Sequence, residues 1–193
     1  MIIADYLDYD TARTWDQGTS IQCASYAFFT MLAEHVQQLH NKEVEFDFDK
    51  YFKEMEENRG KKRRIEYLCS HARNHGYHTK TGELVKIGSY RRFSAWRKWE
   101  WLCRHLQTVG PMIFVVQRYK GHVLNPKSSD VIKMPTKEKR KATHAMMLRG
   151  FDNQSKWLKF QNSYGKNSIK WCPWDVFQKI NLYCYYIKDV TIN

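Results

Sequence analysis

The pattern that begins at Cys23 constrains the fold of this chain more than any other stretch of its sequence. From there on, apolar side chains recur at a spacing near 3.6 residues, which predicts a long and mostly buried helix from about Cys23 to His40. The preceding segment, which contains Gln17 and Gly18, is turn-like. The residues on the helical stripe are Ala24, Ala27, Phe28, Met31, Leu32, His35, Val36 and Leu39.

The position of Cys23 at the start of this helix suits a nucleophile. The positive end of the helix dipole favours the thiolate form of a cysteine placed there. Taken alone, however, a cysteine is more often a buried structural residue. The interpretation of Cys23 therefore depends on the rest of the chain.

A histidine lies on a strand-like segment in the second half of the chain. The segment covers 143–148 and contains His144. A turn follows at 150–153, and the next strand-like segment ends with Asn-Ser-Tyr-Gly at 162–165. Helices in the first half and strands in the second favour an α+β protein of two lobes with a cleft between them.

The order of these elements resembles the papain family of cysteine peptidases. That family has Gln-Gly, then the nucleophilic Cys at a helix start, then His-Ala on a strand, and then Asn-Ser-Trp-Gly. Four matches in the right order are far more specific than any one of them alone. The matching residues here are Gln17-Gly18, Cys23, His144-Ala145 and Asn162-Ser163-Tyr164-Gly165.

The resemblance implies a role for each matched residue. Cys23, His144 and Asn162 would form a catalytic triad, in which the asparagine orients the imidazole. The side-chain amide of Gln17 and the main-chain N–H of Cys23 would form the oxyanion hole. Tyr164 would shield the His–Asn contact from water in place of the family's Trp. Each of these residues, taken singly, also has an ordinary structural interpretation.

The chain departs from the family pattern beside the nucleophile. Ser20-Ile21-Gln22 precedes Cys23 where Cys-Gly-Ser is usual, and Ala24 follows it where the family has Trp. A Gly-Cys-x-Gly-Gly segment, which helps to form the family's substrate groove, is missing from the sequence. Because the resemblance is strong only at 16–29 and 142–165, it predicts the fold more firmly than the substrate preference.

A chain of 193 residues is long enough for one domain with a real core. We predict a single papain-like domain over 1–193, with a helical lobe at about 16–110. The β lobe is predicted at about 111–193, together with an extended N-terminal arm. Further helices are predicted at 49–60, 63–74, 94–110 and 173–180, strands at 83–87, 112–116, 142–151, 156–162, 169–172 and 182–188, and a surface loop at 120–141.

The chain is strongly basic, with a formal net charge of +12. Basic clusters lie at Arg59–Arg64 and Lys137–Lys141, and aromatic residues alternate with charges at Tyr90–Trp99. Such a surface is able to bind nucleic acid, an acidic partner or an anionic membrane. A solvated basic face is the simpler interpretation, because no nucleic-acid-binding motif accompanies the charge.

The sequence also predicts a cytoplasmic protein or, if the chain is viral, one that is associated with the virion or located in the host cytoplasm. No apolar run approaches the ~20 residues that a membrane-spanning helix needs, and the first residues do not read as a secretory signal. Only 22 residues precede Cys23, fewer than an inhibitory propeptide of the family needs. The odd number of cysteines, five, favours a reducing compartment without a disulfide framework.

A second set of metal-ligating residue types lies close together in the sequence. Cys69, His71, His75 and His78 fall within ten residues, as some zinc ligands do. On the predicted helix, however, Cys69 points inward and His71 does not. We therefore predict a solvated helix here, and no metal.

The predicted function is that of a cysteine endopeptidase that hydrolyses peptide or protein substrates without a metal or an organic cofactor. One alternative is an amidase, transglutaminase or other acyltransferase on the same triad, because an amine can intercept the thioester instead of water. The other is a catalytically inactive protein of the same fold, with a structural role in a larger assembly such as a virus particle.

Overall fold

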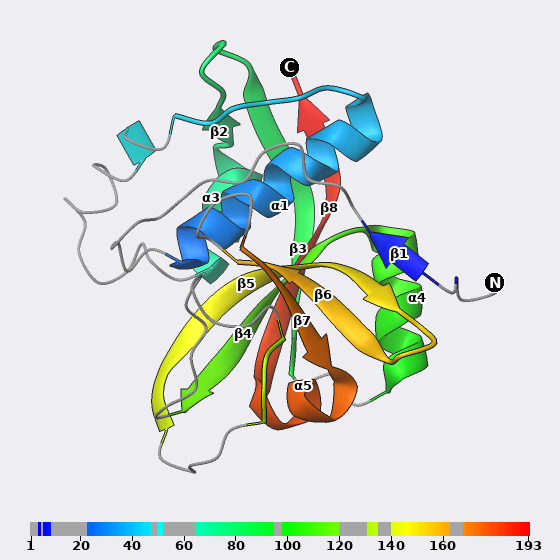
Figure 1. Ribbon diagram of the computed structural model, residues 1–193. Coiled ribbons are helices and arrows are strands. Elements are labelled where there is room, and N and C mark those ends of the chain that lie inside the picture. Colours follow the sequence, from blue (N-terminus) through cyan, green and yellow to red (C-terminus); the bar gives the residue numbers. More distant parts are fainter. Residues whose placement is uncertain are drawn as a thin grey trace.

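One antiparallel sheet runs through the whole molecule (Figure 1). Its strand order is β2-β3-β8-β4-β5-β6-β7, and β1 pairs with β5. The elements of this computed structural model are, in chain order, β1 (Tyr6–Asp8), α1 (Cys23–His40), α3 (Ile65–Asn74), β2 (Tyr77–His78), β3 (Leu84–Ser94), α4 (Trp99–Val109), β4 (Met112–Tyr119), β5 (Arg140–Asp152), β6 (Trp157–Gln161), β7 (Ile169–Pro173), α5 (Trp174–Ile180) and β8 (Asn181–Ile192).

The structure describes residues 4, 6–8, 23–47, 50–51, 65–94, 98–119, 131–134, 140–162 and 168–193. Several predicted features lie outside these ranges: Gln17, Tyr164, the basic cluster at Arg59–Arg64, Lys137 to Lys139 of the second cluster, and most of the helix predicted at 49–60. In the described part of the chain, no helix is long and apolar enough to cross a membrane.

The strands separate two hydrophobic cores because their side chains alternate between the two faces of the sheet. On β4, Ile113 and Val115 point to the core under α1 and α3. Phe114 and Val116 point to the other core, which α4 and α5 cover. The sheet therefore has helices on both faces, and the predicted α+β class is confirmed.

Helix α1 is stabilised by burial, because its first fourteen residues are all buried or partly buried. Phe29 contacts the rings of Phe46, Tyr51 and Tyr77, with centroids 5.1, 5.7 and 4.8 Å away. Such aromatic pairs add about 0.5–1.5 kcal/mol each to the burial of their area. Leu39, which we placed on the apolar stripe, is instead 58% exposed, because residues 38–43 lie on the surface.

The strand β3 corrects one predicted boundary. Ser94, expected to open a helix, is the last residue of β3, and α4 begins at Trp99. Main-chain pairing with β8 extends β3 this far, because Phe93 and Ser94 are partners of Cys184 and Tyr183. Tertiary pairing thus overrides a local helix-start signal. The predicted N-terminal arm is extended at β1, and the helix of α3 ends before Gly76 as expected.

Candidate active site

Cys23 is the first residue of α1 and is only partly buried. It lines a pocket of about 440 Å³, together with Ala24 of the same helix. The main-chain N–H of Ala145, on β5, forms a hydrogen bond with its thiol. The start of α1 therefore places the sulfur directly against the strand that carries the predicted histidine.

His144 is the residue before Ala145 on β5, and its ring is almost completely buried, with 4% exposed. Its Nε2 lies 2.7 Å from Oδ1 of Asn162. Because an amide oxygen can only accept a hydrogen bond, the Nε2 nitrogen carries the proton. In the neutral imidazole, Nδ1 is then the basic nitrogen.

Asn162 follows directly after β6 and is 1% exposed. Its main-chain N–H donates to the carbonyl of Ser168 at 2.9 Å. The β5–β6 ladder fixes the distance between Asn162 and His144, since Met147 of β5 pairs with Gln161 of β6. The sequence motifs and the sheet register together thus bring Cys23, His144 and Asn162 to one place.

The surroundings favour the neutral forms of the cysteine and the histidine. Burial raises the pKa of the Cys23 thiol, against the lowering effects of the Ala145 and Ala24 main chain and of the Arg118 charge. Burial also lowers the pKa of His144 to about 4, against the Asn162 hydrogen bond. The thiolate that we expected from the helix dipole is therefore outweighed by loss of hydration when no substrate is bound.

The other four cysteines differ from Cys23 in exposure. Burial raises the pKa of Cys69 and of Cys103 to about 12, and raises that of Cys172 still further. All five cysteines are free thiols. A thiol that is both buried and protonated reacts slowly with reagents in water. Cys69, Cys103, Cys172 and Cys184 are each 0% exposed.

The wall of the pocket contains a charged and aromatic cluster that sequence reasoning missed. Oε1 of Glu66 accepts hydrogen bonds from the Tyr185 hydroxyl at 2.8 Å and from Arg92 at 3.1 Å. The Arg92 guanidinium lies over the ring of Tyr183, 4.3 Å from its centroid. The signal in the sequence was the alternation of Tyr183 and Tyr185, which places both rings on one face of β8. Apolar residues complete the wall: Ala24, Ile65, Val115 and Ala145.

The metal-ligating side chains of Cys69, His71, His75 and His78 do not come together, and the last two follow the end of α3. Cys69 lies in the core, while His75 and His78 are exposed. The ring of His71 packs against Tyr77 at 4.7 Å between centroids. Among the described residues, no group of three or more potential ligands is placed to hold a metal ion.

Comparisons with known proteins were made at the levels of sequence and structure. No family model and no curated protein matches this sequence. Solved structures do match. Xylellain, a cysteine protease from Xylella fastidiosa, superimposes with a TM-score of 0.78 over 98% of this chain and 88% of its own, at 17% identity.

Two further structures show the same likeness. The Carica candamarcensis cysteine protease CMS1MS2, solved in complex with E-64, has a TM-score of 0.76 and 13% identity over 97% of this chain and 99% of its own. Procathepsin B from Trypanosoma congolense has a TM-score of 0.77 and 8% identity over 97% of this chain and 78% of its own. The protein therefore has the papain-like fold, whose solved examples include these cysteine proteases.

Proposed function

We propose that this protein is a cysteine peptidase that cleaves peptide bonds with Cys23, His144 and Asn162. The observation that carries the proposal is the 2.7 Å contact between His144 and Asn162, beside a partly exposed thiol at the mouth of a pocket. A nucleophile, a base and a group that orients the base are the three parts that thiol-based acyl transfer needs.

In the proposed mechanism, Nδ1 of His144 takes the proton of the Cys23 thiol when a substrate displaces water from the site. The sulfur attacks the carbonyl carbon of the peptide, and the negative charge moves to the carbonyl oxygen. The main-chain N–H of Cys23 and the side-chain amide of Gln17 stabilise this oxyanion. As the C–N bond breaks, the imidazolium gives its proton to the departing amine, and a thioester remains on Cys23.

Water then hydrolyses the thioester and restores the thiol. Asn162 keeps the imidazole in one orientation through both steps, and Tyr164 shields that contact from water. On the acyl side, the pocket accommodates a side chain of the substrate between the rings of Tyr183 and Tyr185 and the apolar wall. We also propose peptide or protein substrates and a cytoplasmic location, which the free thiols favour.

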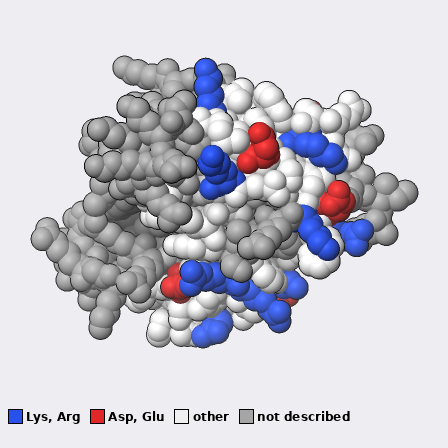
Figure 2. Space-filling model, turned by 90° about the horizontal axis from the view of Figure 1, so that it is seen from below, with Lys and Arg blue, Asp and Glu red and all other residues white. Residues whose placement is uncertain are grey.

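The basic surface supports a preference for acidic partners, whether protein or nucleic acid. The net charge is +12, and blue side chains outnumber red ones on the face shown in Figure 2. Opposite charge raises the rate at which partners meet.

The test of the proposed function combines labelling with turnover. Brief treatment with iodoacetamide or an epoxysuccinyl reagent is expected to modify Cys23 alone, as mass mapping would show. Turnover of an unstructured protein is expected to stop in Cys23→Ala, while the melting temperature stays close to that of the parent. Cys103→Ala serves as the control for loss of a thiol elsewhere. Undiminished hydrolysis by Cys23→Ala would exclude the proposed function.

A further inference from the structure

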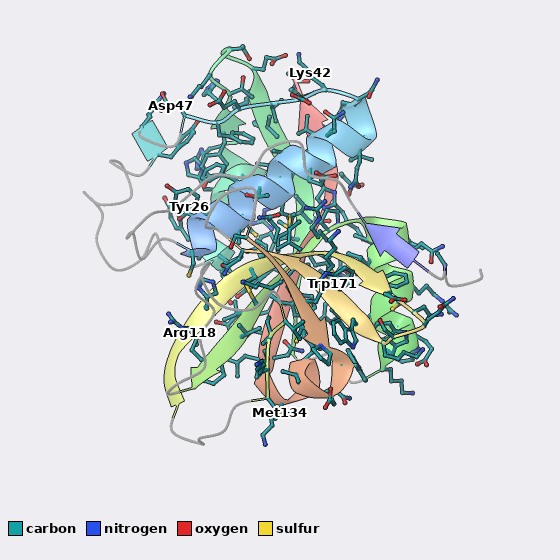
Figure 3. The ribbon with its side chains drawn as sticks, viewed as in Figure 1. Tyr26, Lys42, Asp47, Arg118, Met134 and Trp171 are labelled. Atoms are coloured by element: carbon teal, nitrogen blue, oxygen red, sulfur yellow. The ribbon has the colours of Figure 1, made fainter. Side chains whose placement is uncertain are left out.

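Arg118 lies beside the candidate active site but on the side away from the pocket. On β4 it follows Val116 by two positions, and Val116 is the cross-strand partner of His144. Side chains two apart on a strand share a face, so Arg118 and His144 are diagonal neighbours on one face of the sheet. Figure 3 labels Arg118 beside β5, below the first turn of α1, where Tyr26 is labelled.

The pocket opens on the other face of the same two strands. There, β4 and β5 contribute Val115, Thr143 and Ala145, which alternate with Val116 and His144. His144 also borders the pocket, whereas Val116 and Arg118 do not line it. The two halves of a cleaved peptide must leave in opposite directions from Cys23. Since His144 gives its proton to the departing amine, the half of the substrate that leaves first lies on the side of His144 and Arg118.

Among the described residues, no acidic side chain neutralises the charge of Arg118. Its Nε is buried and has no hydrogen-bond partner, and no acidic side chain forms an ion pair with it within the part of the chain that the structure describes. Its charge acts on both reacting groups, since it lowers the pKa of Cys23 and that of His144. A half-buried guanidinium whose Nε–H has no partner among the described residues is suited to bind a carboxylate through two parallel hydrogen bonds.

We infer that Arg118 binds a carboxylate on the leaving half of the substrate and so selects peptides with negative charge directly after the cleaved bond. The inference rests on the proposed peptidase function and adds a specificity residue to it. Two sources present this carboxylate: an acidic side chain of the first residue after the cleaved bond, or the chain terminus when a single amino acid is released.

The first experiment compares kcat/KM for peptides that share the acyl half and differ only after the cleaved bond. One pair carries Glu or Gln at the first position, with an amidated end. The other pair releases glycine or glycinamide. The parent is expected to favour the charged member of a pair by about ten- to a hundredfold, which corresponds to one charge-assisted hydrogen bond. Preference in the first pair identifies a side chain as the ligand, and preference in the second pair identifies the terminus.

Arg118→Gln is expected to remove this preference, which is measured as the ratio of kcat/KM within each pair and so does not depend on any change in rate that the lost charge causes for both members. Arg118→Lys keeps the charge without the planar fork and is expected to retain part of the preference. Arg104→Gln is the matched control, because it removes the same charge from an exposed position on α4, on the far side of the molecule (Figure 1). Equal preference in the parent and Arg118→Gln, or an equal loss in Arg104→Gln, would refute the inference.

A second experiment does not depend on peptide cleavage. Iodoacetate and iodoacetamide alkylate the same thiol, and only the first carries a carboxylate. The ratio of their rates at Cys23 is expected to fall by about five- to tenfold in Arg118→Gln and to stay unchanged in Arg104→Gln. If the ratio falls while no peptide is cleaved by the parent, the peptidase proposal fails and the carboxylate site stands. If the ratio does not change while peptides are cleaved, the carboxylate site fails alone.

Discussion

Two regions of the molecule each enclose a histidine that is almost completely buried. In one, His144 lies between the start of α1 and the β5–β6 ladder, and its Nε2–H donates to the side chain of Asn162 at 2.7 Å. In the other, His35 lies three turns further along α1, and its Nε2 contacts the carbonyl oxygen of Pro111 at 3.2 Å. Burial lowers the pKa of both rings to about 4.

The difference between the two regions lies in what else surrounds each ring. The main chain at Gly110 packs directly against the ring of His35, so an added Cβ atom would lie 2.8 Å from Cε1 of the imidazole. Next to His144 lie a thiol and a pocket that admits other molecules. Burial and a neutral imidazole alone therefore do not distinguish a catalytic histidine from a structural one. A buried imidazole becomes a candidate base only where a nucleophile and an open space adjoin it.

The largest expected difference is between His144→Gln and His35→Gln. We expect His144→Gln to lower kcat/KM by about a thousandfold or more, because the base and the proton donor are both lost. We expect His35→Gln to lower the free energy of unfolding by about 1–3 kcal/mol, because a buried hydrogen bond is disturbed, and to leave kcat/KM nearly unchanged. Peptide turnover and urea unfolding of both variants provide the measurements. Comparable losses of activity in the two folded variants would remove the distinction.

The two histidines are expected to contribute equally to the pH dependence of the free energy of unfolding. Each ring has a pKa near 4 in the folded protein and near 6.5 in the unfolded chain, so between these values the unfolded state binds more protons. The contribution of each neutral ring to the free energy of unfolding is therefore fully present above pH 6.5. It is lost as the pH drops toward 4, by roughly 2–3 kcal/mol for each ring. The measurement is urea unfolding of the parent, His35→Gln and His144→Gln at several pH values.

His35→Gln is expected to remove the part of the pH dependence of unfolding free energy that comes from His35, and His144→Gln the part that comes from His144. Each variant is expected to keep the part that comes from the other histidine. The pKa of His105 is also lowered to about 4 by burial, but this side chain is partly exposed, so its share is smaller. A slope that is the same in the parent and in both variants would mean that neither ring is kept neutral by the fold.

Asn162→Ala removes the side-chain hydrogen-bond partner of His144. The partner of His35 is the main-chain carbonyl of Pro111, which a substitution cannot remove. We expect kcat/KM to fall by about ten- to a hundredfold and some activity to remain, since the amide orients the base without reacting itself. The double variant with His144→Gln is expected to lose no more activity than His144→Gln alone. Strictly additive losses would show that Asn162 acts independently of the imidazole.

The effect of Gly110→Ala is expected only on stability and only in the His35 region. Gly110 has φ of +106°, and its new methyl group would press on the imidazole, so we expect a loss of about 1–3 kcal/mol in stability. Gly82→Ala is the matched control: its φ is +92°, but nothing lies within 4 Å of the added Cβ. The difference in unfolding free energy between the two variants measures the contact with His35. Equal losses would show that the backbone alone is responsible.

The sequence predicted the parts of the site that depend on local pattern. The apolar period after Cys23 predicted α1, and the motif around Asn162 predicted the end of β6. Residues that depend on the packing of distant strands were not predictable in this way. Arg118 and Tyr185 join the site through the register of β4, β5 and β8, which no local spacing encodes. Burial of Cys23 likewise depends on the assembled lobes, so the helix dipole alone gave the wrong direction for its pKa.

The insertion of β8 between β3 and β4 has a consequence for the chain while it is being synthesised. β8 pairs with β3 through nine residues and provides the tyrosines of the pocket wall. Neighbours in space that are so far apart in sequence close a large loop late in folding. A nascent chain that already contains Cys23, His144 and Asn162 therefore still lacks the pocket. We expect ribosome-bound chains to gain normal Cys23 alkylation kinetics only after β8 has left the exit tunnel, so the proposed peptidase activity is expected to begin only then.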